Sequence, residues 1–499
     1  MKKLFPLIII FVVVFLLYYQ TLFVYFSQDD FFMFKISQTD NTLGGFLNLF
    51  AIHSFPERGI AFYRPIFREA LHNIYFSAFD LNHLPFRILM LIVHFINISL
   101  VYFLVNIIFG NKILATLAAF FFGITAANVA LLYYLAGGIE TGGATMFALL
   151  TLILYRKYLV NNNPALYLAT FVTFLMAIFS HEIVGMTAGV MLIMLITSNV
   201  KKISSKAIAL LPFLLATVFL FYIDLVKIGL SSGEKQYQFI FNISSVLNSI
   251  VWYSVWAFGI PEMLIDFIGP GIKLNPVLMR YWGNYYTVIF IAFGIALSIF
   301  LFMFLYLILK KKFVFFDRRF CFFLLWLMVG LLPIIFLPNH KSTHYLVFVL
   351  PAFWTVVTFI VLNFYTNMSK YAKFTASILT ALVIFSLLTL SAVSIKLEDT
   401  TYWAASRGRL AERLINQIKT TYPNLPKEAI IYFENDPNYP HLTAEWGSSS
   451  KQVAVILNNQ DALRLIYNDS NLRVYYEDLD KPAEKLQETN VYRIKAKIY

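Results

Sequence analysis

Cysteine and charged residues are scarce in this sequence, and each scarcity excludes a class of protein. Cys321 is the only cysteine among 499 residues, so neither an intrachain disulfide nor a thiolate metal cluster can form. Charged residues make up 13% of the chain, compared with roughly 25% in soluble domains. Internal repeats and low-complexity tracts are also lacking. The composition therefore excludes a disulfide scaffold and an ordinary soluble domain.

Apolar residues are correspondingly abundant. They make up 59% of the chain, and the mean hydropathy is +0.70. The sequence therefore predicts an integral membrane protein. The net charge of +12 does not indicate a nucleic-acid partner, because the basic residues occur in short runs between hydrophobic segments rather than on one soluble face.

Hydrophobic runs long enough to cross a bilayer recur over the first 395 residues. A spanning helix needs about 17 to 25 apolar residues. We predict eleven such helices, near residues 4–26, 86–109, 113–135, 141–155, 164–180, 183–198, 207–226, 286–309, 320–337, 346–363 and 374–395. The first is interpreted as a retained anchor, since no small-residue cleavage site follows it. The apolar stretch 246–268 is interpreted as interfacial or re-entrant.

Basic residues predict the orientation of this bundle, because cytoplasmic loops carry an excess of Lys and Arg. With the eleven spans above, fifteen bases and a single acid, Asp317, fall on the side of the N-terminus. The bases are Lys2, Lys3, Lys112, Arg156, Lys157, Lys201, Lys202, Lys206, Lys310, Lys311, Lys312, Arg318, Arg319, Lys370 and Lys373. We therefore expect a cytoplasmic N-terminus, an extracytoplasmic C-terminus and a location in the plasma membrane or bacterial inner membrane.

The last hundred residues differ in texture from the rest. Charges become frequent, and short apolar runs at 429–433, 453–457, 472–476 and 491–498 predict strands beside a helix over 402–422. The predicted fold is thus a membrane all-α bundle of about eleven transmembrane helices over residues 1–396. Amphipathic helices are expected in its outer loops, 27–85 and 227–285, and a small extracytoplasmic α/β domain follows over 397–499.

Two adjacent carboxylates, Asp29 and Asp30, follow the first span on the predicted outer side. Such a pair can supply a general base, with the other acid holding a metal, a hydroxyl or its partner. The alternative is a helix cap, with Ser27 as N-cap and Asp30 reaching back as in a capping box. If Asp30 caps, Asp29 is the freer carboxylate and the better candidate for the base.

A second outer corner carries His181 and Glu182 between the fifth and sixth spans. An acid at membrane depth favours a functional site, whereas a polar corner wetted by lipid headgroups is the alternative. The corner is not a zinc-protease motif, because Gly185 stands where the second histidine would be required.

Basic side chains on the outer side are candidate phosphate ligands. His340 and His344 are four residues apart, a spacing that could bind a metal, but Lys341 and hydroxyl groups between them favour an anion site; an interfacial cluster is the third alternative. Arg280 lies in the large outer loop. Arg64, in Tyr63-Arg64-Pro65, either reaches a phosphate or belongs to a turn before an amphipathic helix.

Together these features resemble the GT-C superfamily of polytopic glycosyltransferases. The resemblance rests on the inner N-terminus, the acid pair after the first span, Tyr-Arg-Pro-Ile at 63–66, Leu-His-Asn-Ile at 71–74, Ser-His-Glu at 180–182 and the polar corner before His-Tyr-Leu at 344–346. Within the superfamily the chain is most similar to the branch containing protein O-mannosyltransferases, TMTC-like proteins and bacterial aminoarabinose transferases. It departs where relatives often have Lys-Glu, here His181-Glu182. The C-terminal domain matches no family that we can name.

The resemblance implies transfer of a sugar from a polyprenyl-phosphate donor to a hydroxyl of a protein, lipid or glycan acceptor, with no nucleic acid involved. Asp29 or Asp30 would act as base, and attack opposite the phosphate would invert the anomeric centre. His340, Lys341, His344, Arg280 and Arg64 would stabilise the leaving phosphate. His181 and Glu182 would position the acceptor or, if the enzyme uses a divalent cation such as Mg²⁺ or Mn²⁺, help to bind it. No cofactor is required by the sequence.

Two rival interpretations come from other classes. A transporter or flippase of lipid-linked glycans would carry charges inside spans and broken helices. The second interpretation is an enzyme of other chemistry. A ligase of lipid-linked glycans would use a similar donor but is expected to have its large catalytic loop late in the chain. A membrane O-acyltransferase would need a buried histidine, for which only His94 is available.

Overall fold

The computed structural model of the protein describes residues 5–200, 203–229, 235–269, 271, 273–311, 317–440, 447–480 and 490–498. The chain folds into two compact units. One, here the membrane unit, consists of Met1–Tyr19, Ala51–Phe67 and Leu89–Thr400. The other, here the mixed unit, consists of Gln20–Phe50, Arg68–Ile88 and Thr401–Tyr499. The first outer loop, residues 27–85, is therefore divided between the two units. The prediction instead assigns the whole of this loop to a single domain, residues 1–396.

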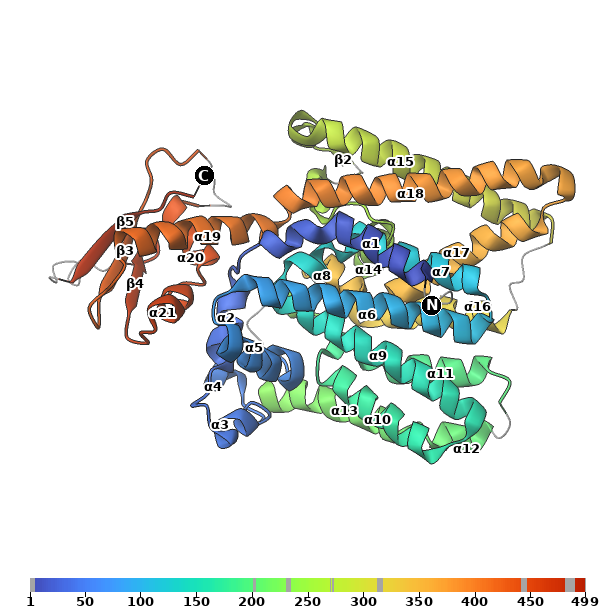
Figure 1. The fold of residues 1–499 in the computed structure, drawn as a ribbon, viewed down its shortest axis with the longest axis horizontal. Coiled ribbons are helices and arrows are strands. Elements are labelled where there is room, and N and C mark those ends of the chain that lie inside the picture. The colour runs from blue at the N-terminus through green and yellow to red at the C-terminus, as the bar shows by residue number, and fades with distance from the viewer. Residues whose placement is uncertain are drawn as a thin grey trace. The chain divides into compact units, whose positions relative to one another are not determined.

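The membrane unit is built from apolar helices of 5 to 34 residues, and several of the long ones run side by side (Figure 1). They are α1 (Phe5–Tyr18), α6 (His83–Phe109), α7 (Lys112–Ile124), α8 (Val129–Tyr133), α9 (Leu135–Asn161), α10 (Pro164–Ile178), α11 (Thr187–Thr197), α12 (Ile203–Ile208), α13 (Leu211–Tyr222), α14 (Ile243–Ala257), α15 (Pro276–Leu309), α16 (Arg318–Ile335), α17 (Leu350–Asn367) and α18 (Lys373–Thr401). A short two-stranded ribbon, β1 (Ile268–Gly269) with β2 (Lys273–Leu274), precedes α15.

Among the described residues, eight helical segments are long and apolar enough to cross a membrane, and a ninth is obtained if a bent pair counts as one span. The eight are Phe5–Phe23, His83–Phe109, Leu135–Asn161, Ile203–Ile228, Pro276–Leu309, Arg318–Ile335, Leu350–Asn367 and Lys370–Thr421. The other predicted spans fall on the bent pair and on two shorter apolar helices, Pro164–Ile178 and Glu182–Thr197. The protein is therefore a multi-pass membrane protein, while the number eleven stays a prediction. Among the bases behind the predicted orientation, Lys2, Lys3, Lys201, Lys202 and Lys312 lie outside the described residues.

Small residues allow close helix packing inside the membrane unit. Ala115, Ala118 and Ala119 are buried on α7, which packs against α17. Phe121 of α7 stacks on Trp354 of α17, with ring centroids 5.2 Å apart. Without a hydrophobic driving force between helices in lipid, small side chains and tight van der Waals contact supply much of the association.

The bent pair breaks at Thr125. Helices Lys112–Ile124 and Ala126–Tyr133 meet at an angle of 53°. The Asn128 side chain donates to the Phe122 carbonyl at 2.6 Å, and the Tyr18 hydroxyl donates to the Thr125 carbonyl at 2.6 Å. The Asn128 side chain satisfies a carbonyl at the break, and the Tyr18 hydroxyl is a second donor to the Thr125 carbonyl, which also accepts the Asn128 backbone N–H at 3.0 Å.

The mixed unit joins short helices of the first outer loop to the C-terminal α/β region. The loop contributes α2 (Asp29–Ser37), α3 (Leu43–Asn48) and α5 (His72–Phe79), while α4 (Phe55–Arg58) belongs to the membrane unit. The C-terminal region contains α19 (Trp403–Thr421), β3 (Ile430–Glu434), α20 (Ser449–Ile456), α21 (Asp461–Tyr467), β4 (Arg473–Tyr476) and β5 (Val491–Lys495). The three strands form a parallel sheet in the order β4-β3-β5.

Three of the four predicted strands are confirmed, and so is the helix over 402–422. The strand predicted over 453–457 is wrong, because most of this segment belongs to α20. Its helical start is fixed by Ser448, whose hydroxyl accepts the Lys451 backbone N–H. A crossover helix is also what a parallel pair such as β3 and β4 needs, since a tight hairpin cannot connect parallel strands.

Candidate functional site

A buried polar group of the membrane unit centres on Arg64. The segment carrying it is held by its backbone: the Tyr63 N–H donates to the Asp224 carboxylate at 2.8 Å, and the Ile66 N–H donates to the Phe179 carbonyl at 3.4 Å. Because these bonds fix both sides of Arg64, its side chain is directed into the unit rather than left on a loose loop.

Arg64 binds two carboxylates at once. Its Nε and one terminal nitrogen donate to the two oxygens of Glu182 at 2.7 and 2.6 Å, a bidentate pair. The other terminal nitrogen donates to Glu140 at 2.5 Å. The side chains are 13%, 18% and 0% exposed for Arg64, Glu182 and Glu140. We call these three residues the Arg64 network. With one guanidinium and two carboxylates, it carries a formal charge of −1.

A glycine on α9 lets the Arg64 segment approach that helix. A Cβ at Gly143 would lie 2.1 Å from the ring of Phe67, a distance that real Cβ atoms do not show. Phe67 therefore packs directly on α9 where glycine leaves room. Glu140 is three residues earlier on the same helix, which brings its carboxylate within reach of Arg64.

The ionisation of Glu182 follows from this geometry. Burial alone would raise the pKa of Glu182, but the adjacent Arg64 guanidinium more than reverses that effect and lowers the pKa to about 2. Glu182 is therefore ionised at any physiological pH, and it can accept hydrogen bonds but cannot donate a proton.

Three histidines lie around Tyr345, close to the network. The ring centroids of His344, His340 and His181 are 4.0, 5.6 and 6.3 Å from that of Tyr345. Nδ1 of His181 accepts the Ile183 backbone N–H at 3.2 Å, so a neutral ring carries its proton on Nε2. Burial lowers the pKa of His344 well below its ordinary value of 6.5, so this ring is neutral near pH 7.

Glu262 fixes the loop that carries these histidines. Its carboxylate accepts the Thr343 backbone N–H at 2.7 Å, the Thr343 hydroxyl at 2.6 Å and the Ser342 hydroxyl at 3.0 Å. The Ser342 hydroxyl in turn lies 2.9 Å from Nδ1 of His344. The position of the His344 ring is thus set by an acid more than eighty residues earlier in the chain.

A cavity of about 130 Å³ adjoins this cluster. His181, Glu182, Asp224 and Tyr345 line it, and most of the remaining wall is aromatic or aliphatic, with Phe62 among its residues. Convergent polar groups in a mostly apolar cavity are the usual features of a ligand site. The volume is below the roughly 300 to 1,000 Å³ of typical ligand pockets, so it suits part of a larger ligand.

The structure thus brings together five of the predicted site residues: Arg64, His181, Glu182, His340 and His344. Two others lie elsewhere. The Lys341 ammonium donates to the Asn248 side chain at 2.9 Å, and Arg280 lies on the exposed surface of α15, 5.7 Å above the Tyr281 ring. The roles assigned to all of these residues stay predictions.

The acid pair belongs to the mixed unit. The helix α2 begins at Asp29 and its N-cap is Gln28, so the prediction of Ser27 as N-cap is wrong by one residue. Asp30 is buried and accepts the Ser27 backbone N–H at 3.1 Å, which is the capping role considered for it. Asp29 is only half-buried and interacts electrostatically with Arg407, whose guanidinium donates to Gln28 at 2.6 Å.

A divalent cation fits these residues poorly. Among the described residues, no group of three or more His, Cys, Asp or Glu side chains could hold a metal ion. Both oxygens of Glu182 already accept hydrogen bonds from Arg64, so a cation would have to displace the guanidinium. We derive no step through a metal.

Sequence reasoning missed Glu140, Asp224 and Glu262. The signal for Glu140 was an acid within a glycine-rich run, Gly137 to Gly143, directly before the predicted fourth span. Glu262 is one of two acids, with Asp266, in the otherwise apolar stretch 246–268.

No protein-family model matches the chain, and no curated protein matches it. Among solved structures, the apo oligosaccharyltransferase of Archaeoglobus fulgidus superposes with a TM-score of 0.48 at 11% identity, over 95% of this chain and 64% of that one. The oligosaccharyltransferase AglB of the same organism, in complex with an inhibitory peptide and a dolichol-phosphate, gives a TM-score of 0.45 at 11% identity, over 91% and 63%. This chain spans less than two thirds of either protein, and similarity at this level carries no argument about fold or function.

Proposed function

We propose that the protein is an integral-membrane inverting glycosyltransferase that moves a sugar from a polyprenyl-phosphate donor to an acceptor hydroxyl on the extracytoplasmic side. The proposal joins the resemblance of the sequence to the GT-C superfamily with the Arg64 network. The observation that carries it is Glu182, an ionised carboxylate held by Arg64 at the wall of a mostly apolar cavity in the membrane unit. Charged groups are costly at membrane depth and are usually functional there.

The donor supplies its own leaving group, so two protein functions are required. A base must take the proton of the acceptor hydroxyl, a role that we assign to Asp29, because Asp30 is occupied as a cap. Hydrogen-bond donors and cations must stabilise the phosphate as the bond to the sugar breaks. Among the candidates, Arg64 would have to share its guanidinium with two carboxylates. His344 would need a second proton to donate to the phosphate, because the Ser342 hydroxyl beside its Nδ1 already donates to Glu262, so a neutral ring carries its proton on Nδ1.

Glu182 and His181 would position the acceptor. An ionised carboxylate accepts a hydrogen bond from a hydroxyl or an amide, and His181 offers the Nε2–H described above on the same cavity wall. This role agrees with the negative charge of the network, which favours a hydrogen-bond donor over a bare phosphate at this position. The isoprenoid part of the donor is too large for the cavity and would lie along the lipid-facing helices.

The test is a transfer assay with the full chain reconstituted in liposomes that contain polyprenyl-phosphate-linked sugars. We expect wild-type protein to release polyprenyl phosphate and Glu182→Gln to lose roughly 10²-fold in rate, the cost of a misplaced substrate. Glu57→Gln, the same change at an exposed acid of the first outer loop, should keep the wild-type rate. No transfer by wild-type protein with any such donor, or full activity of Glu182→Gln, would contradict the proposal.

Two observations favour a second candidate, a flippase or transporter of lipid-linked glycans. Glu140 is an acid buried on a helix of membrane-spanning length, and the pair α7 and α8 is broken at Thr125. Both are features of transport proteins. Movement of a labelled lipid-linked glycan between leaflets, without cleavage of its phosphate–sugar bond, would support this candidate against the enzyme.

A further inference from the structure

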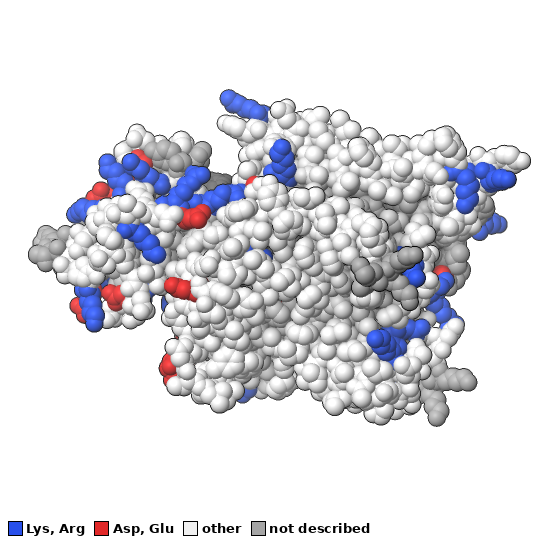
Figure 2. All heavy atoms as spheres, in the orientation of Figure 1, with Lys and Arg blue, Asp and Glu red and all other residues white. Residues whose placement is uncertain are grey.

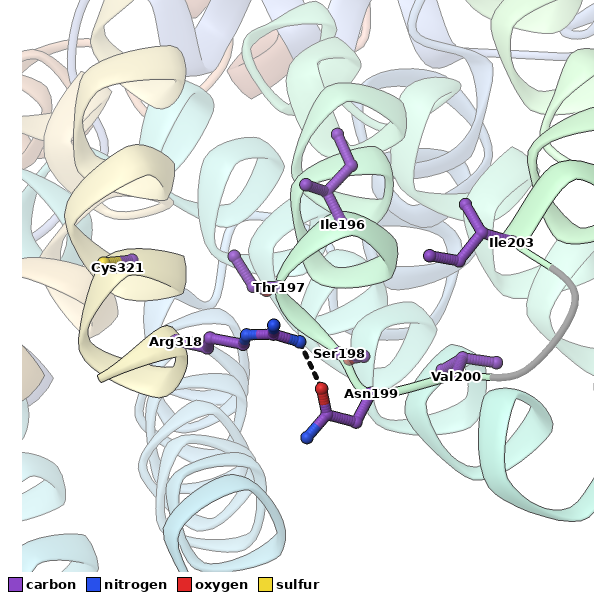
Figure 3. Close-up of a pocket in the computed structure, with 8 residues that line it drawn as sticks. All are labelled: Ile196, Thr197, Ser198, Asn199, Val200, Ile203, Arg318 and Cys321. Atoms are coloured by element: carbon purple, nitrogen blue, oxygen red, sulfur yellow. Dashed lines mark hydrogen bonds between the residues drawn. The ribbon is translucent and has the colours of Figure 1, made fainter. Parts of the chain in front are cut away.

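The Arg64 network lies near the N-terminal ends of α9 and α11. A second polar region lies near the C-terminal ends of the same two helices. A cavity of about 560 Å³ opens between the end of α11 and the start of α16. Figure 3 shows Arg318 extending from α16 toward Asn199, with which it forms a hydrogen bond. An adjoining cavity of about 330 Å³ shares Ser198, Asn199 and Arg318 and adds Arg156 and Arg319 to its wall. Together we call them the basic pocket.

The basic pocket has more cations than acids. Among the described residues that line it, Asp317 is the only acid, and its carboxylate accepts hydrogen bonds from Arg319 at 2.6 and 2.9 Å. The bonds described for the other two arginines go to neutral groups: Arg156 donates to the Ser198 hydroxyl at 3.3 Å, and Arg318 donates to the Asn199 carbonyl oxygen. The described side chains that line the pocket therefore carry a net formal charge of +2.

Apolar side chains at its rim indicate that the pocket opens toward lipid. Ile196 and Ile203 line the larger cavity and are 62% and 48% exposed. At the end of a membrane helix, an exposed aliphatic side chain beside an arginine indicates the level in the bilayer where the acyl chains meet the headgroups.

The pocket lies at one end of the helix bundle. Arg156 is near the end of α9, Ser198 and Asn199 follow α11, and Arg318 and Arg319 begin α16. Arg319 also donates to the carbonyl of Phe109, the last residue of α6, at 3.5 Å. Lysines and arginines outnumber acids at this end of the unit, which holds bases predicted to be cytoplasmic (Figure 2).

We propose that the basic pocket binds the phosphodiester headgroup of an anionic membrane phospholipid, with Arg156 and Arg318 as its ligands. Guanidinium groups bind phosphate oxygens through paired, charge-assisted hydrogen bonds. Basic pockets between membrane helices recognise anionic headgroups by the same chemistry. The acyl chains of the lipid lie over Ile196 and Ile203, and the headgroup enters the cavity. This site is separate from the Arg64 network and independent of the proposed transfer reaction.

The test uses the purified full chain in detergent, with binding of phosphatidylglycerol and phosphatidylcholine of matched acyl chains measured by native mass spectrometry. We expect wild-type protein to retain phosphatidylglycerol preferentially. The double variant Arg156→Gln/Arg318→Gln should bind it at least about tenfold more weakly, with binding of phosphatidylcholine unchanged. The double variant Lys112→Gln/Lys157→Gln, which removes two bases that do not line the pocket, should bind as wild type does.

Two further measurements keep the test decisive. Ile203→Trp fills the cavity without changing the charge of the pocket, and it should also weaken the binding of phosphatidylglycerol. This variant tests the proposal independently if the arginine variant folds poorly. Inorganic phosphate at millimolar concentration should fail to displace the lipid. Equal loss in the lysine variant, unchanged binding in both pocket variants, or displacement by inorganic phosphate alone would overturn the proposal.

Discussion

The Arg64 guanidinium lies 2.5 Å from the Glu140 carboxylate, and that carboxylate is completely buried on α9, a helix of membrane-spanning length. An ionised acid in such a helix is stabilised only with a partner at hand. The partner, Arg64, comes from the first outer loop. The ion pair therefore couples the conformation of this loop to the position of α9.

Removing Arg64 should therefore destabilise the protein strongly. Arg64→Met leaves Glu140 and Glu182 without their guanidinium, and breaking a buried pair from one side typically costs about 3 to 5 kcal/mol. Thermal unfolding in detergent should show a clear fall in Tm. Arg280→Met is the matched control, because it makes the same change at an exposed arginine, and it should leave Tm unchanged. Equal effects of the two variants would show that the network contributes no stability.

The two acids of the mixed unit should behave differently. Asp29→Asn removes a base while keeping the shape of the side chain, so sugar transfer should fall by roughly 10² to 10⁴-fold, with donor binding retained. Asp30→Asn weakens the bond to the Ser27 N–H and should lower stability by about 0.5 to 2 kcal/mol, the scale of a lost cap. If both variants keep full transfer activity, the acid pair serves only to begin α2.

Acidification should weaken the fold through His344. Its pKa in the folded protein lies well below 6.5, so below pH 6.5 the unfolded chain binds a proton that the folded protein does not. Stability therefore falls as the pH decreases from 7 to 5. His344→Gln should show a smaller drop in Tm over this interval than wild-type protein. A Tm of wild-type protein that is the same at both pH values would contradict a buried neutral ring.

The predicted orientation can be tested with fusions. A reporter joined after Tyr499 should be active outside the cytoplasm, and one joined at Lys312 should be active inside, although both residues lie outside the described part of the structure. The charge bias requires this arrangement. An opposite result at either position would place the Arg64 network on the wrong face for an extracytoplasmic acceptor.

The membrane helices were predictable because hydrophobic length is a local property of the sequence. So were the polar corners at Arg64 and at His181-Glu182, where charge interrupts apolar runs. Their pairing was not predictable, since Arg64 and Glu182 are 118 residues apart and Arg64 and Glu140 are 76 apart. No local pattern specifies which acid meets which base.

One omission has a physical cause. The glycines around Glu140 favour a loop, whereas α9 begins at Leu135 and uses those glycines for close packing. Arg280 is exposed near the start of α15, above the Tyr281 ring, and its role stays a prediction. The predicted separation between Asp29 and the cationic cluster stays a prediction, because these residues belong to different units.

The contact between Gly143 and Phe67 predicts which pairs of residues homologous proteins can carry at these two positions. A methyl group at position 143 cannot coexist with a phenyl ring at position 67 in this arrangement. A relative that carries alanine or serine at 143 should therefore carry a smaller side chain at 67, and the two positions should covary. Such covariation would be detectable in an alignment long before any ligand of the Arg64 network is known.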